Sequence, residues 1–285
     1  MSKQHMSATQ LELLDISYEI NSRDEETINK LVLESIRINQ ITLEILVEQK
    51  TKLNEAEKSQ VTPIAQNVTN YMLLKMQEIN ELLYQKKEQG KITYNGYISY
   101  LIQAWYCSSY TPELQNKFNQ LISQYSQTFN EDKLRRGSKL ILMMESDSNE
   151  EIGHEIFALQ DLQKLGIKQF NISHDIFDES KQLITTQLGL LDQSKFIGFL
   201  GYCFYMEFLF AKYIDFQLKL LREAGIPREA QTFLFNHYVI DLSHAGHDIE
   251  LLNFFADSDE IVVLINENID VVHSLYKGIL TRAFN

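Results

Sequence analysis

The scarcity of proline and glycine constrains this chain more than any other feature of its sequence. It has three prolines and eleven glycines in 285 residues. A fold of many short strands needs turn residues roughly every ten residues, whereas long helices need few of them. No useful run of alternating polar and apolar residues is present, and 44% hydrophobic residues are enough for a substantial core. The sequence therefore predicts an all-α fold.

Breaks in the helical pattern divide the chain into two predicted parts. Residues 1–65 are expected to form an N-terminal helical extension, with one helix from Asp24 to about Glu57 and a break near Pro63. This extension is expected to pack on the remainder or to mediate dimerisation. Residues 66–285 are expected to form the main helical domain. Thr111-Pro112 is expected to end one helix and open the next, because proline lacks a backbone N–H and disfavours helix at the residue before it. The expected helices of the main domain span residues 66–88, 94–110, 112–128, 132–144, 149–165, 175–191, 193–224, 228–255 and 259–282.

Composition narrows the classes of partner. The formal charge is −13 and no dense run of lysine and arginine is present, so nucleic acid is not an expected partner. Cys107 and Cys203 lack a metal-ligand spacing and are expected to be small buried hydrophobes. The first residues do not resemble a signal peptide, and no stretch approaches the roughly 20 apolar residues of a membrane span. We therefore expect no membrane span, a cytoplasmic location and a homodimer as the default oligomer.

The segment FLFNHYVIDLSHAGHDIELL carries the most specific chemical pattern. It places His237, Asp241 and His244 at positions i, i+4 and i+7, which share one face of a helix. Two imidazoles and a carboxylate on one stripe form half of a site for a divalent first-row metal. A carboxylate among apolar neighbours is costly unless it is paired or bound to a metal. The alternative is that the histidines are satisfied individually and Asp241 is paired locally. His247 fits the stripe less well and is expected outside the ligand set or at the surface.

Two other segments place polar side chains within helical patterns. In SNEEIGHEIFALQDLQKLGI, Glu151 and His154 are spaced i, i+3 and share a predicted helix face. Read alone, the glutamates of this segment also fit the solvated first turn of a helix. In GFLGYCFYMEFLFAKYIDF, Glu207 lies in a nearly unbroken apolar and aromatic run. Metal coordination, a buried ion pair and a raised pKa all remain open for Glu207.

Taken together, the candidate ligands are three carboxylates and three imidazoles on three predicted helices. Di-iron sites are built from such inward-facing side chains in helical bundles. Structural zinc sites close at four ligands, often with cysteine, so the larger, oxygen-rich set favours iron. A ferritin-like bundle would need Glu-x-x-His on two helices, and only one such motif is evident. The candidate metal ligands are Glu151, His154, Glu207, His237, Asp241 and His244.

This pattern resembles the heme-oxygenase-like di-iron oxidases and oxygenases, also grouped as iron-containing redox enzymes. In that family one helix carries a carboxylate and a histidine, a later helix a glutamate, and a last helix H-x-x-x-D-x-x-H. The separations here, 53 residues from His154 to Glu207 and 30 from Glu207 to His237, are similar to those of the family. The segment GKITYNGYISYLIQAWYCSSYTPEL resembles the family's first core helix and its turn. The resemblance covers roughly residues 68–255, and the N-terminal extension has no recognised counterpart.

The resemblance implies a heme-oxygenase-like helical bundle with two metal ions, either two irons or an iron–manganese pair. It implies one iron on Glu151, His154 and His237, and the other on Asp241 and His244.

The same resemblance assigns a role to Glu207, which would bridge the two metals or complete the second site and is the candidate catalytic carboxylate. The first carboxylate varies in position in the family, so Glu150 or Asp147 could replace Glu151. The implied activity is oxidation of a small organic substrate by O₂, through N-oxygenation, desaturation or C–C cleavage. Aromatic residues that could line the substrate cavity are Trp105, Tyr106, Tyr202 and Tyr205.

Two other functions are compatible with the sequence. A cofactorless enzyme of the same fold, resembling thiaminase II, would use a cysteine, and Cys203 lies near Glu207 on the same predicted helix. That reading leaves the six potential ligands unexplained. A non-enzymatic helical binding or effector protein would instead use the extension and the apolar helices as a partner surface, and its histidines would bind no metal.

Overall fold

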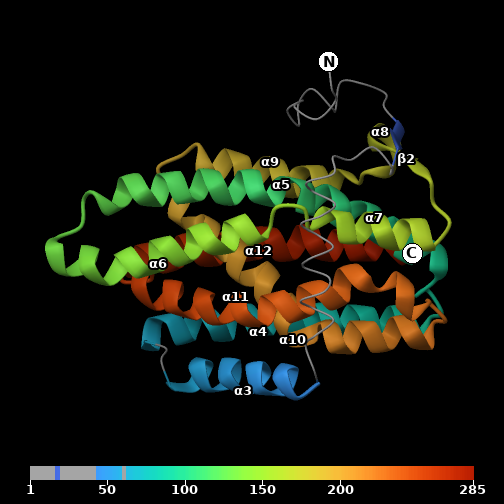
Figure 1. Cartoon of the computed structure of the whole chain (residues 1–285), viewed down its shortest axis with the longest axis horizontal. Helices are drawn as coiled ribbons and strands as arrows, with labels where there is room; N and C mark the ends of the chain where they lie inside the picture. The colour runs from blue at the N-terminus through green and yellow to red at the C-terminus, as the bar shows by residue number, and fades with distance from the viewer. Residues whose placement is uncertain (1–16, 20–42, 60–61) are drawn as a thin grey trace.

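The fold is described here from a computed structural model, which places residues 17–19, 43–59 and 62–285. Within these residues the chain is a bundle of long helices (Figure 1), so the predicted all-α class is confirmed. The α-helices are α3 (Leu43–Ser59), α4 (Pro63–Glu88), α5 (Tyr94–Ser126), α6 (Glu131–Glu150), α7 (Glu155–Lys164), α8 (Ile172–Asp175), α9 (Asp178–Leu191), α10 (Leu200–Glu223), α11 (Thr232–Phe255) and α12 (Asp259–Ala283). The 3₁₀ helices are η2 (Phe196–Phe199) and η3 (Arg228–Ala230), and the strands are β1 (Ser17–Glu19) and β2 (Gln169–Asn171).

Local capping explains where several of these helices begin. Thr62, Thr93, Asn130 and Ser258 each precede a helix and accept a hydrogen bond from the backbone N–H three residues later. A side-chain oxygen at this position satisfies one of the backbone donors that the first helical turn leaves unpaired. These caps separate α4, α5, α6 and α12 from the turns before them.

Helix α5 continues through Pro112, so the expected helix end at Thr111-Pro112 is wrong. Proline inside a helix removes one backbone hydrogen bond and costs about 3 kcal/mol or more. The apolar side of α5 is buried against α6, α7, α9 and α12 along its length, and this packing offsets that cost. The result is one helix of 33 residues, which runs along one side of the bundle (Figure 1).

The described part of the N-terminal extension packs on the main bundle. Helix α3 lies against α11 at an edge of the molecule (Figure 1) and buries Leu46 and Leu53. Lys50 forms an ion pair with Asp215 of α10 at 2.9 Å. The remainder of the expected helix from Asp24, as far as residue 42, lies outside the described residues.

A short antiparallel pairing was not expected from the sequence. Strand β1 pairs with β2 so that Ser17 faces Asn171 and Glu19 faces Gln169. Three residues are too few to produce a detectable alternation of polar and apolar side chains.

Helix α10 packs on α4, α11 and α12. The segment Phe196–Glu223 is long and apolar enough by composition to cross a membrane, but most of it is buried inside the protein. Its apolar character therefore fits a core helix. Gly201 allows the closest approach to α12, because a Cβ at this position would overlap the carbonyl oxygen of Ile265. This approach brings α12 beside the part of α10 that carries Glu207.

Candidate metal centre

Five of the six predicted ligands converge in two overlapping groups. One group is Glu151, His154 and His237, and the other is Glu151, Asp241 and His244. Within each group the potential ligand atoms all lie within 4.8 Å of one another, and all five residues are buried. Glu151 belongs to both groups, as expected of a carboxylate that two metal ions could share.

Helix α11 supplies three of the five because its spacing puts them on one face. His237, Asp241 and His244 are 7%, 3% and 2% exposed. The Nδ1–H of His237 donates to the carbonyl oxygen of Phe233 at 2.8 Å. This bond fixes the tautomer and leaves Nε2 of His237 with its lone pair, as in metal sites where a second hydrogen bond orients the imidazole.

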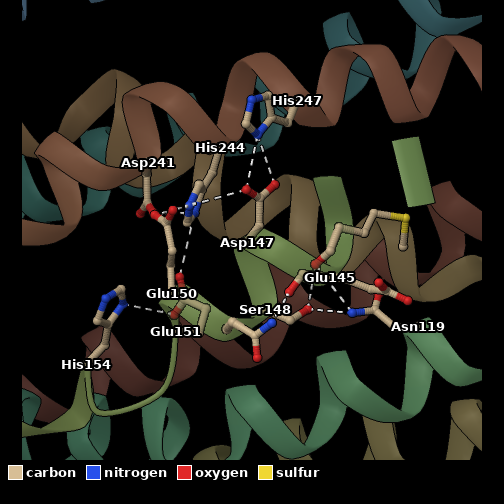
Figure 2. Close-up of polar contacts among 12 residues, drawn as sticks. Asn119, Glu145, Asp147, Ser148, Glu150, Glu151, His154, Asp241, His244 and His247 are labelled. Carbon is tan, nitrogen blue, oxygen red and sulfur yellow. Dashed lines mark hydrogen bonds and ion pairs between the residues drawn. The ribbon is translucent and has the colours of Figure 1, made fainter. Parts of the chain in front are cut away.

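Glu151 and His154 lie in the turn between α6 and α7, not on one helix face as the sequence analysis expects. Glu151 caps the end of α6, and His154 immediately precedes α7. Between them Gly153 has a φ of 99°, a left-handed conformation that favours glycine. The chain reverses there and holds His154 Nδ1 3.2 Å from Glu151 Oε2 (Figure 2).

His244 gives the clearest sign that the cluster can accept a cation. Neither ring nitrogen forms a hydrogen bond, although both are buried. Nδ1 lies 3.6 Å from Glu151 Oε1 and 3.7 Å from Asp241 Oδ1, while Nε2 lies 3.5 Å from Glu150 Oε2 (Figure 2). These contacts are ion pairs when the ring is protonated, and the same imidazole and carboxylates offer ligand atoms to a cation when the ring is neutral. The donor set, imidazoles beside carboxylates without a thiol, fits a divalent first-row metal.

Burial and neighbouring charges shift the pKa values of the groups in this cluster. Burial opposes ionisation of Glu151, but the neighbouring imidazoles of His154, His244 and His237 lower the pKa of its carboxyl to about 2. Burial opposes the charged form of His244, yet Glu150, Glu151 and Asp241 raise the pKa of its imidazole to about 9. Burial first, and then the charge on Glu151, raises the pKa of Asp241 well above its ordinary value. Protons therefore supply the charge balance that metal ions would supply on binding.

Glu207 belongs to neither metal group, although it lies in the same region. It is half-buried on α10, where it lines a cavity together with Glu151 and Asp241. It interacts electrostatically with the buried carboxyl of Asp248, to which a protonated Glu207 can donate a hydrogen bond. Burial and the nearby carboxylates raise the pKa of Glu207, and this hydrogen bond raises it further. The pKa of Asp248 rises to about 7 through burial, while the bond from Glu207 opposes that rise. Both shifts favour a protonated carboxyl in this pair.

Asp248 is a functional candidate that the sequence analysis missed. It continues the stripe of His237, Asp241 and His244 at i+11, so extending the same spacing by one step would have found it.

His247 lies at the outer side of the cluster, as expected. It is half-buried and contacts Asp147 Oδ2 at 2.9 Å (Figure 2). Asp147 and Glu150 approach Nε2 of His244 at 3.9 and 3.5 Å. These two carboxylates, considered as alternatives to Glu151, therefore face the outer nitrogen of His244, whereas Glu151 faces its inner nitrogen.

A cavity adjoins the metal groups. Its enclosed volume is about 80 Å³, and it opens toward solvent. Of the four aromatic residues proposed to line it, Tyr202 does so, whereas Trp105, Tyr106 and Tyr205 are not among its lining residues. Its walls also include Cys107 and Cys203, which are half-buried and pack against the hydrophobic core. The lining comes mainly from α5, α10, α11 and α12.

Comparison with solved structures identifies the fold of this helical bundle. A solved structure from Shewanella denitrificans OS217, described as a domain of unknown function with a heme oxygenase-like fold, is similar with a TM-score of 0.57 and 20% sequence identity. The match covers 86% of this chain and 92% of that one. The chain thus has a heme oxygenase-like fold, as the resemblance implies. No protein-family model matches the chain, and no curated protein sequence matches it.

Proposed function

We propose that the protein is a non-heme di-iron oxidase or oxygenase that uses O₂ to oxidise a small organic substrate. The observation that carries this proposal is the pair of overlapping ligand groups that share Glu151 and border a cavity. A single carboxylate common to two groups supports a dinuclear site better than a mononuclear one.

The ligands divide between the two metal positions. His154 and His237 would hold the first iron with Glu151, and Asp241 and His244 would hold the second with the same carboxylate. The bound irons would supply the reduction of O₂ and the oxidation of the substrate. Iron is preferred because the set combines imidazoles with carboxylates and contains no thiol, the ligand common in structural zinc sites.

The protein's own groups would orient the ligands, exclude water and hold a proton. The bond from His237 to Phe233 fixes one imidazole, and apolar walls limit water in the cavity. Glu207, paired with Asp248, places a protonated carboxyl at the cavity wall. This is the basis for retaining Glu207 as the candidate catalytic carboxylate, acting as a proton donor with no assigned metal bond.

A cysteine-dependent enzyme of the same fold is less well supported. Burial raises the pKa of the Cys203 thiol well above its ordinary value, and the nearby carboxylates Glu207 and Asp248 raise it further. The thiolate is the nucleophilic form, so these surroundings oppose nucleophilic catalysis. A purely binding protein would leave the convergence of five buried potential ligands in two groups unexplained.

The test is iron binding by purified protein under anaerobic conditions, followed by rapid mixing with O₂. We expect about two irons per wild-type chain, in line with dinuclear carboxylate–histidine sites, and a transient visible absorption band. Glu151→Gln keeps the side-chain shape but weakens both positions, so it should lose most of the iron and the band.

The matched control is His174→Asn, which replaces an exposed histidine on α8 outside both groups and should behave as wild type. A folded wild-type protein that binds no iron stoichiometrically would overturn the proposal and favour the cysteine or binding-protein alternatives.

A further inference from the structure

One wall of the cavity is a stripe along α5. Ala104, Cys107, Ser108, Thr111 and Gln115 follow one another at helical spacing and all border the cavity. The stripe extends back to Tyr100, so the lining residues span about 22 Å along the axis of α5 at 1.5 Å per residue. Such a length suits an elongated ligand better than a compact one.

The chemistry of the cavity away from the metal groups is mostly apolar and uncharged. No lysine or arginine is among the described residues that line it. Its acidic lining residues are Glu151, Glu207 and Asp241, which belong to the metal cluster or adjoin it. An anionic group placed elsewhere in the cavity would therefore be buried without a partner, which is costly.

Most polar side chains in these walls already have partners. Both ends of the Gln103 amide are used, and the hydroxyl groups of Tyr100 and Tyr276 lie 3.3 Å apart. The hydroxyl of Thr111 lies 3.4 Å from the carbonyl oxygen of Cys107.

Gln115 differs from these residues. It is 8% exposed, it borders the cavity, and its Oε1 is buried without a hydrogen-bond partner. Rotation of the amide exchanges its oxygen and nitrogen, so the side chain can present either an acceptor or a donor. A ligand group at this position would satisfy a buried polar atom, which is the condition under which a hydrogen bond contributes most to specificity.

We infer that the cavity binds an elongated apolar molecule with one uncharged hydroxyl or primary amide group, and that this group hydrogen-bonds to the Gln115 amide. The inference rests on the proposed function in that it names the substrate class of the same site. It makes Gln115 a positioning residue, since it would fix the ligand along α5 without touching the metals.

The test uses metal-free full-length protein and two probes of equal chain length, 1-octanol and octanoate, with binding measured by calorimetry at pH 8. We expect octanol to bind at least about ten-fold more tightly than octanoate, because the carboxylate would be buried unpaired. Gln115→Leu should weaken octanol binding about two- to ten-fold, the usual effect of one net hydrogen bond. Ala104→Phe, which fills the cavity, should abolish it.

The matched control is Gln217→Leu, which replaces another buried glutamine, one that does not border this cavity. Its octanol affinity should equal that of wild type. Equal binding of octanoate and octanol, an unchanged affinity in folded Gln115→Leu, or no binding of either probe would each overturn the inference. Because no metal is present, these outcomes are independent of whether the protein binds iron.

Discussion

His244 is an imidazole surrounded by carboxylates, and its protonation state affects stability and would affect the binding of a metal. Its folded-state pKa, about 9, lies above the ordinary value of 6.5. A group with a raised folded-state pKa stabilises the protein fully below its unfolded pKa and loses that contribution as pH rises through the folded value. Asp248, with a pKa raised to about 7, acts in the same direction at lower pH. Metal ligation requires the neutral imidazole and therefore opposes this proton.

The first prediction concerns pH. Without metal, the melting temperature should fall as pH rises from 7 to 9, and His244→Gln should flatten this dependence. Over the same range the affinity for a divalent metal should rise, because fewer protons must be displaced. Thermal scans and metal titrations at pH 7, 8 and 9 measure both trends. A melting temperature of the metal-free wild type that does not change with pH would contradict the assignment of the proton to His244.

The second prediction concerns the carboxyls of Glu207 and Asp248. Glu207→Gln can still donate a hydrogen bond to Asp248, so the free energy of unfolding of the metal-free protein should stay within about 0.5 kcal/mol of wild type. Glu207→Leu cannot, and leaves a buried carboxylate without its partner at a cost of about 1–3 kcal/mol. Chemical denaturation distinguishes the two variants. Equal stability of both would mean that Glu207 is ionised and does not donate to Asp248.

For individual residues, the sequence was most informative where several candidate ligands lie on the same helix. His237, Asp241 and His244 could be placed together because a helix has a fixed period. Glu207 could be singled out as a carboxylate in an apolar run, but its partner lies 41 residues away on α11, and helical spacing does not reveal contacts between helices. The free amide of Gln115 could not be recognised either, because its lack of a partner depends on the surrounding helices.

Among the structural elements, the α6–α7 turn is the one on which the metal centre most depends. Its Gly153 has a positive φ, which an L-residue adopts at a cost of about 1–2 kcal/mol. The third prediction is that Gly153→Ala lowers the free energy of unfolding by that amount and also weakens metal binding, because Glu151 and His154 flank the strained residue. Denaturation and metal titration of the same variant measure the two effects.

Gly166 is the control for that prediction. It also has a positive φ, 83°, and a Cβ there would meet nothing within 4 Å. Gly166→Ala should therefore cost a similar free energy of unfolding and leave metal affinity unchanged. Similar losses of metal affinity in both variants would show that the turn has no specific role.

The sequence predicted a helix end where a local signal such as a capping residue determines it. It did not predict a helix end that depends on packing against other helices. The beginning of α12 follows from Ser258, a capping residue that the sequence displays. Pro112 is an equally visible signal for a helix end, yet α5 continues because its neighbours bury it on several sides. The turn at Gly153 was placed inside a helix, because a single glycine between two glutamate-rich segments does not specify its own φ.

At the scale of the whole molecule, the fold class followed from the scarcity of proline and glycine and from long apolar helices. The packing of these helices could not be predicted from the sequence, because it depends on which small residues meet in space. Gly201 of α10 is such a residue, since a Cβ would overlap the carbonyl oxygen of Ile265 on α12. Both helices line the cavity, through Tyr202 and Tyr276 among others.

The fourth prediction follows from this contact. Gly201→Ala should force α10 and α12 apart and lower the free energy of unfolding by about 1–3 kcal/mol, the usual cost of overpacking. Gly189→Ala is the control, because Gly189 lies in α9 and a Cβ there would meet nothing within 4 Å. That variant should match or exceed wild-type stability, since alanine is the better helix former. Chemical denaturation compares the pair, and equal stabilities would contradict the close approach.

The longest wall of the cavity and the two ligand groups are carried by different elements, and this affects which substitutions the protein can accept. Helix α5 builds the longest wall of the cavity but contributes no member of either ligand group. Substitutions along its cavity stripe can therefore alter which molecule is accepted without disturbing the groups that would bind metal. The shape and polarity of the cavity can therefore change through α5 while α11 and the α6–α7 turn stay constant.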